Sequence, residues 1–129
     1  MSQVKVFGLR ENLKETREQL SEIIHTTIVD MLSFPKNKKF HRFISFDQEN
    51  MIFPDDKSQQ YIIIEIIMMK GRETNTKKNL IKSLFQNINK ELKIALSDIE
   101  ICIIESEPSN WGFRGITGDE IKLNYEVNL

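Results

Sequence analysis

Hydrophobic and polar residues follow two different periods along this chain. Short runs rich in β-branched and aromatic residues, at 4–7, 40–46, 62–69 and 99–104, each predict a strand. Between them, apolar residues recur every three to four positions, as on one face of a helix. The first stripe comprises Leu13, Leu20, Ile23, Ile24, Ile28, Met31 and Leu32, and the second Leu80, Ile81, Leu84, Phe85, Ile88 and Leu92. The chain therefore reads strand, helix, strand, twice.

The two halves match one another at a constant spacing. Sliding the sequence by 60 residues superposes apolar positions of the predicted strands and of the predicted helices. The matched pairs are Val4 with Ile64, Val6 with Ile66, Leu20 with Leu80, Ile24 with Leu84, Ile28 with Ile88, Leu32 with Leu92 and Phe43 with Ile103. We therefore expect pseudo-repeats over residues 2–46 and 62–104 of a single domain that spans 1–129.

These elements predict an α+β fold, in which a four-stranded sheet carries both helices on one face. A helical crossover within each half favours parallel pairing of its two strands. The tail, 108–129, lies outside the repeat, and its apolar residues Ile121, Leu123, Tyr125 and Val127 alternate with polar ones, which predicts a C-terminal strand. A sheet covered on one face leaves the other apolar and bare, so we expect the chain to associate with itself.

Polar residues next to the helical stripes predict where the helices begin and end. Asn12 with Glu15 has the spacing of a capping box for the first helix, and Pro35 closes that helix. Gly71 ends the strand before the second helix, and Thr74 or Asn75 caps the helix itself.

The composition narrows the range of partners. Lys and Arg total 18 against 19 Asp and Glu, so the net charge of −1 argues against a nucleic-acid partner. The basic run from Lys36 to Arg42 is short, and we interpret it as a solvated turn. The amino-terminal residues lack the apolar core of a signal peptide, and the longest apolar run, 61–69, is too short to cross a membrane.

Few residues have the chemistry of a metal or cofactor site. Cys102 is the only cysteine, so an internal disulfide is impossible and a reduced cytoplasmic location is favoured. We expect Cys102 to be buried in a strand. His25 and His41 have no cluster of acids around them, so neither is expected to bind metal. The Gly-rich RGITG lacks the Lys-Ser/Thr of a phosphate loop, and no cofactor is expected.

Two strings, IIIEIIMMKGRETNTKK and ESEPSNWGF, resemble the tautomerase superfamily, in particular its branch around malonate semialdehyde decarboxylase. With the amino-terminal strand and the doubled β-α-β unit, the resemblance covers nearly the whole chain. Trp111 and Phe113 stand at the W-x-F positions of that family. The resemblance implies a homotrimer with active sites near subunit interfaces and a small carboxylate as ligand.

In that family a proline, exposed by removal of the initiator Met, is the proton-transfer group. Here the position is Ser2. An α-amino group titrates near neutrality, at about 7.7–8.0, so a free amine on Ser2 keeps part of this capacity without the fixed φ of proline. If Met1 is retained, Ser2 has no free amine.

The resemblance aligns the family's substrate-binding arginines with Arg72 and Lys70. Arg72 offers a carboxylate a bidentate donor, and Lys70 a point charge only. An Asp of the decarboxylase branch aligns with Lys38, which reverses the charge there. From the residues alone, Arg72 could equally be a surface arginine paired with Glu73 or with an acid of another subunit. Trp111 and Phe113 could line a pocket or pack at a subunit interface, and the enrichment of aromatic residues at interfaces favours packing.

Three functional hypotheses stay open at this point. The first is a tautomerase-like enzyme, an isomerase or decarboxylase, that acts on a small 2-oxo acid with Ser2 as a weakened base. The second is a non-catalytic trimer that binds a small anion through Arg72. The third is a structural or interaction oligomer. The replaced proline and the reversed charge at Lys38 favour the second hypothesis over the first.

Overall fold

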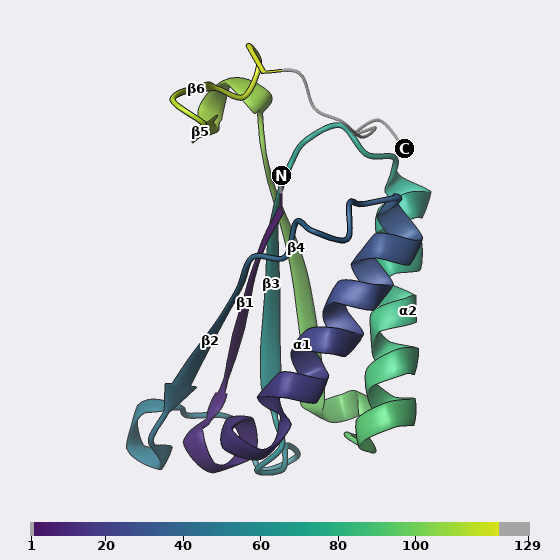
Figure 1. Cartoon of the computed structure of the whole chain (residues 1–129). Coiled ribbons are helices and arrows are strands. Elements are labelled where there is room, and N and C mark those ends of the chain that lie inside the picture. The colour runs from purple at the N-terminus through teal and green to yellow at the C-terminus, as the bar shows by residue number, and fades with distance from the viewer. Residues whose placement is uncertain (1, 122–129) are drawn as a thin grey trace.

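The computed structural model describes residues 2–121, in which a mixed four-stranded sheet carries two helices on one face (Figure 1). The elements are β1 (Ser2–Leu9), α1 (Arg10–Leu32), β2 (His41–Phe46), β3 (Ile62–Met69), α2 (Thr74–Leu92) and β4 (Ile99–Ser106), with short 3-10 turns at Gln48–Asn50, Leu96–Asp98 and Pro108–Asn110. The strands are ordered β2-β1-β3-β4 in the sheet. The predicted α+β fold is confirmed.

Strand pairing has the same pattern in both halves. β1 runs parallel to β2 and β3 runs parallel to β4, as the helical crossovers predict, whereas β1 and β3 are antiparallel. In the β1–β3 register, Lys5 lies opposite Glu65, with Val4 opposite Ile66 and Val6 opposite Ile64. Of these facing pairs, Lys5 and Glu65 are the ones 60 positions apart, so equivalent positions of the two halves meet at this pair.

The core fills the space between the sheet and the helices. Alternate residues of β1 and β3 are buried there, because successive side chains of a strand point to opposite faces. The largest of the fully buried side chains are Leu13, Leu20, Ile24, Ile28, Leu32, Ile62, Ile64, Ile66, Met68, Leu80, Leu84 and Ile88. Each such side chain contributes about 1.5–3 kcal/mol relative to an exposed one, so this cluster dominates the stability of the fold.

The face opposite the helices is neither bare nor uniformly apolar. The connection between β2 and β3 folds over one end of it, where Met51 and Tyr61 pack with Leu9. At its centre the Lys5 ammonium lies 3.8 Å from the Glu65 carboxylate. Cys102, the Cα partner of Glu65 in β4, is exposed, so the expectation that it is buried is wrong.

The helix ends differ from the capping predictions. α1 follows β1 without a loop, so Leu9 is the capping residue and Asn12 lies inside the helix, where its Nδ2 donates to the Gln60 carbonyl at 3.2 Å. α1 ends before Pro35, because Ser33 adopts the left-handed conformation with φ 51° and donates its N–H to the Val29 carbonyl. At α2 the capping position is Glu73, one residue before the predicted Thr74.

The tail folds back above the end of β4 (Figure 1) as a small hairpin of β5 (Gly112–Phe113) and β6 (Ile116–Thr117). Its turn contains Arg114 and Gly115, both with positive φ. The predicted C-terminal strand falls, from residue 122 onward, outside the described residues. Neither helix of the described chain has the length and apolar character that a bilayer crossing requires.

Candidate functional site

The topology brings the ends of several segments to one edge of the sheet. β1 starts there, and because β3 is antiparallel to it, Ser2 lies opposite Met68 near the end of β3. The segment before β2 reaches the same edge, where the Val4 N–H donates to the Phe40 carbonyl at 2.9 Å. β4 ends beside β3, and the Lys70 N–H donates to the Ser106 carbonyl at 2.8 Å. We call this edge the site edge. The segments that meet there carry all of the site residues predicted from the sequence, namely Ser2, Lys38, Lys70, Arg72, Trp111 and Phe113.

Arg72 is buried at the junction of β3 and α2, where only 5% of its surface is exposed. Its Nη1 lies 3.9 Å from the sulfur of Met68, the residue opposite Ser2. Gly71 makes this approach possible, because its φ of 146° is a conformation that side chains disfavour. The interpretation of Arg72 as a surface arginine is therefore wrong, and its charge lies within the fold beside Met68.

Lys70 and Lys38 are placed differently from Arg72. The Lys70 ammonium lies 3.1 Å from the Glu107 carboxylate, and both side chains are more than half exposed, so this pair adds little stability. Lys38 is half-buried in the turn before β2, where its N–H donates to the Pro35 carbonyl at 3.1 Å. Of the three predicted cations, only Arg72 is buried.

Trp111 and Phe113 form an edge-to-face pair, with ring centroids 6.5 Å apart. The Trp111 Nε1 is buried and has no hydrogen-bond partner among residues 2–121. Gly118 holds this segment against the end of β3: a Cβ there would lie 2.5 Å from the Pro108 carbonyl oxygen and 2.9 Å from Met69 Cε. The tail is therefore docked closely on the site edge.

Sequence analysis missed an acid at this edge. Glu105 of β4 is the Cα partner of Met68, and its Oε1 accepts a hydrogen bond from Lys77 of α2 at 2.7 Å. Its Oε2 is buried with no hydrogen-bond partner in the described part of the chain. The available signal was the alternation of β4, which places Glu105 on the same face as Ile99, Ile101 and Ile103.

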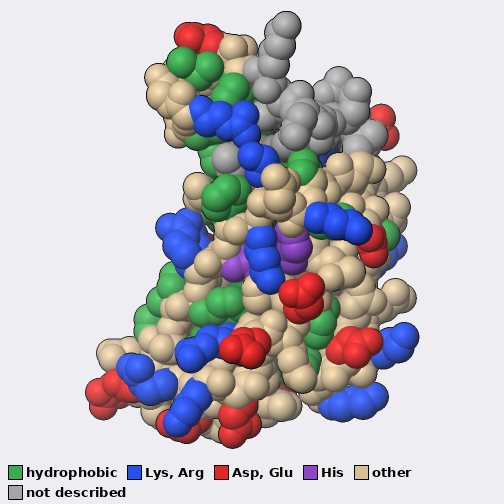
Figure 2. Space-filling model, viewed as in Figure 1, with side chains coloured by type: hydrophobic (Ala, Val, Ile, Leu, Met, Phe, Trp, Pro, Cys, Tyr) green, Lys and Arg blue, Asp and Glu red, His purple; other side chains and the backbone are tan. Residues whose placement is uncertain are grey.

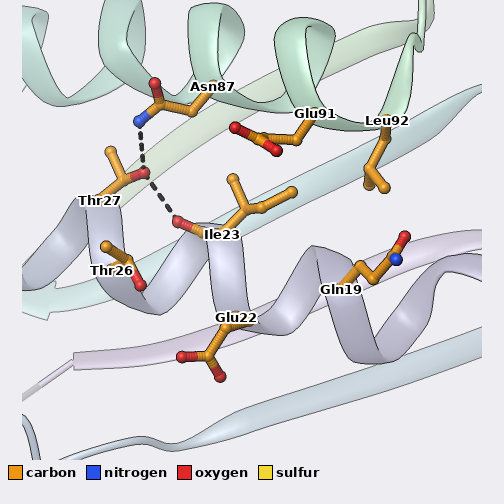
Figure 3. Close-up of a pocket in the computed structure, with 8 residues that line it drawn as sticks. All are labelled: Gln19, Glu22, Ile23, Thr26, Thr27, Asn87, Glu91 and Leu92. Atoms are coloured by element: carbon orange, nitrogen blue, oxygen red, sulfur yellow. Dashed lines mark hydrogen bonds between the residues drawn. The ribbon is translucent and has the colours of Figure 1, made fainter.

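A groove of about 440 Å³ lies elsewhere, between the outer faces of α1 and α2 (Figure 3). Across it, the Asn87 Nδ2 donates to Thr27 Oγ1 at 2.9 Å, and Thr27 donates to the Ile23 carbonyl. The groove is lined by Gln19, Glu22, Ile23, Thr26, Thr27, Asn87, Glu91 and Leu92. None of the predicted site residues lines it.

The two histidines lie close together near the start of β2. Their rings are 5.9 Å apart, His25 Nε2 donates to the Lys36 carbonyl, and His41 Nδ1 lies 2.7 Å from Ser21 Oγ. Burial of the imidazole, followed by the charge of Lys39, lowers the pKa of His41 from 6.5 to about 4. Within residues 2–121, no group of three or more His, Cys, Asp or Glu is arranged to hold a metal ion.

A family model described as tautomerase enzyme matches residues 38–114, which is more than half of the chain. This chain belongs to the tautomerase family. Two relatives from Bacillus subtilis (strain 168) support the assignment. Probable tautomerase YusQ is 21% identical, and the match covers 74% of this chain and 80% of YusQ. Probable tautomerase YrdN is 22% identical, and the match covers 81% of this chain and 88% of YrdN.

Solved structures of other tautomerase-like proteins share the fold. A wild-type fused 4-OT, described as an asymmetric trimer, is 19% identical with a TM-score of 0.79, and the match covers 91% of this chain and 96% of that chain. FG41 malonate semialdehyde decarboxylase, inhibited by 3-bromopropiolate, is 22% identical with a TM-score of 0.76, and the match covers 86% of this chain and 88% of that chain. At these identities the likeness concerns the fold alone.

Proposed function

We propose that this tautomerase-family chain binds a small carboxylate, of the 2-oxo acid class, at the site edge and catalyses proton transfer on it weakly. The observation that carries the proposal is the buried Arg72 beside Met68, the residue opposite Ser2. A guanidinium stays charged at any working pH, and its planar fork matches the two oxygens of a carboxylate. Arg72 is therefore the residue that binds the acid group.

Weak activity follows from the residue at position 2. In the branch that this sequence resembles, proline at that position transfers the proton, and Ser2 lacks its ring. Lys38 puts a positive charge where that branch has an acid. A form of the chain that binds the anion without chemistry is the second candidate, and these same two residues favour it.

We further propose that the chain forms a homotrimer and is located in the cytoplasm. The fused 4-OT relative is a trimer. The open face of this sheet still exposes Ile104, and the β2–β3 connection exposes Ile52 almost completely, at 95%. A second copy would cover such apolar groups. Sedimentation in dilute buffer distinguishes the trimer from a stable monomer, and a monomer would refute this part of the proposal.

Titration with pyruvate and phenylpyruvate tests the anion site. A charge-assisted hydrogen bond of about 1.5–3 kcal/mol corresponds to roughly ten- to a hundredfold in affinity, so Arg72→Ala should weaken binding by that factor. Arg72→Lys should recover only part of it. Arg17→Ala, which removes an exposed arginine from α1, is the matched control. Equal binding by wild type and Arg72→Ala would refute the site.

A further inference from the structure

Three residues on three adjacent strands form one row at the site edge. Ser2 of β1 lies opposite Met68 of β3, which lies opposite Glu105 of β4. Register partners point to the same face of a sheet, and Lys77 of α2 reaches Glu105, so this row faces the helices. Adjacent strands are about 4.8 Å apart, so the Cα atoms of Ser2 and Glu105 are separated by roughly 10 Å. Met68, the middle residue of this row, is fully buried.

The two oxygens of Glu105 have different surroundings. Oε1 is fixed by the Lys77 ammonium at 2.7 Å, whereas Oε2 is buried and has no hydrogen-bond partner among residues 2–121. Buried polar atoms are normally paired, so an oxygen left in this state is a place for a ligand proton. The side chain as a whole is 21% exposed, which leaves a path to the carboxylate.

We propose that Glu105 is the proton-transfer group of this site, with Lys77 as its positioning residue. The assignment rests on the proposed function, because Arg72 must first hold the substrate carboxylate. Glu105 removes a proton from the carbon next to the substrate carbonyl. The C–H electron pair becomes the C=C bond, and the C=O pair moves to oxygen, giving an enolate. The enolate oxygen then takes a proton from water, and Glu105 gives its proton to the hydroxide that is left. Alternatively, the carboxyl proton of Glu105 exchanges with solvent and is then returned to carbon. No oxidant or reductant is consumed.

This assignment explains how the site can transfer protons without the groups expected from the resemblance. Lys38 carries the wrong charge to accept a proton, and Ser2 has a free amine only if Met1 is removed. Glu105 supplies a carboxylate in the row of Ser2, held by an ion pair with α2. Carboxylates are common general bases, and such groups contribute about 10²–10⁴-fold to rate.

Proton exchange measured by NMR separates this role from binding. Phenylpyruvate is incubated in D₂O with each protein, and loss of the signal of the carbon-bound protons next to the carbonyl is followed. Glu105→Gln keeps the size of the side chain and should slow exchange at least about a hundredfold while carboxylate affinity stays within a few fold. Glu105→Asp should restore part of the rate. Lys77→Met should slow exchange less than Glu105→Gln does.

Glu100→Gln is the matched control, because it makes the same change on the opposite face of the same strand. It should leave exchange unchanged. If Glu105→Gln exchanges protons at the wild-type rate, the assignment is wrong. If that variant does not fold, wild-type exchange rates in both Glu105→Asp and Lys77→Met overturn the assignment instead. A wild-type protein that binds phenylpyruvate without exchange overturns the role of Glu105 but leaves the anion site, whereas absence of binding refutes the proposed function as well.

Discussion

Thr27 and Asn87 are 60 residues apart in the chain and are joined by a hydrogen bond of 2.9 Å between α1 and α2. Lys5 and Glu65, separated by the same interval, lie opposite one another in the sheet. Both pairs join corresponding positions of the two β-α-β halves. An axis that relates the halves would pass through both pairs, one in the helical layer and one in the sheet.

Loss of the Thr27 hydroxyl should destabilise this helix contact. Thr27 is 2% exposed, so Thr27→Val leaves the Asn87 amide without its acceptor inside the groove. We expect a loss of about 1–3 kcal/mol in the free energy of unfolding, measured by urea denaturation. Thr26→Val, at the exposed neighbouring position on the same groove, should change it by less than about 0.5 kcal/mol. Equal effects of the two substitutions would contradict the role of the hydrogen bond.

The depressed pKa of His41 predicts a loss of stability in mild acid. Its pKa is about 4 in the folded chain and 6.5 in the unfolded one. Between those values the unfolded chain binds the extra proton, so stability is complete above pH 6.5 and falls as pH drops toward 4. Allowing for solvent screening at this half-buried side chain, we expect a fall of roughly 1–2 kcal/mol. His41→Gln should flatten the profile between pH 7.5 and 5, and an identical slope in both proteins would refute the prediction.

The docking of the tail depends on Gly118. A methyl group there would overlap the Pro108 carbonyl and Met69, so Gly118→Ala should lower stability by about 1–3 kcal/mol and shift the fluorescence of Trp111. Gly112→Ala is a matched control in the same hairpin, because its added Cβ would meet nothing within 4 Å. Thermal melts of both variants compare their stabilities directly. If they melt alike, the close packing of the tail is not what stabilises it.

Proline at position 2 should raise the tautomerase rate. Ser2→Pro, with removal of Met1 verified by intact mass, provides a secondary amine held in a ring at the start of β1. We expect faster enol–keto conversion of phenylpyruvate than in the parent protein, followed by its ultraviolet absorbance. Rapid turnover by the parent protein itself would show that Ser2 costs less activity than we propose.

The regular elements could be predicted because burial imposes a period on the sequence. β3 follows the apolar run 62–69 residue for residue, since both of its faces are partly covered. The ends of the helices were harder to predict from the sequence. Asn12 forms no cap because α1 already begins at Arg10. Its side chain instead donates to Gln60, a residue 48 positions away, and no local pattern encodes that partner.

The candidate site was only partly predictable for a similar reason. Alternation along β4 gives the face of Glu105, but its proximity to Met68 and Lys77 depends on register and on the placement of α2. The burial of Arg72 likewise depends on the fold around the junction of β3 and α2, which its neighbours in sequence do not specify. On the face shown in Figure 2, basic and acidic side chains are interspersed, so charge on that face does not mark the site.

Because β1 begins at the site edge, any polypeptide fused ahead of Ser2 emerges among the segments that carry Arg72 and Glu105. A purification tag at the amino terminus would therefore lie at the proposed substrate site, and an inactive tagged protein would say nothing about the untagged one. Assays of this chain call for a fusion that is cleaved to leave residue 2 first.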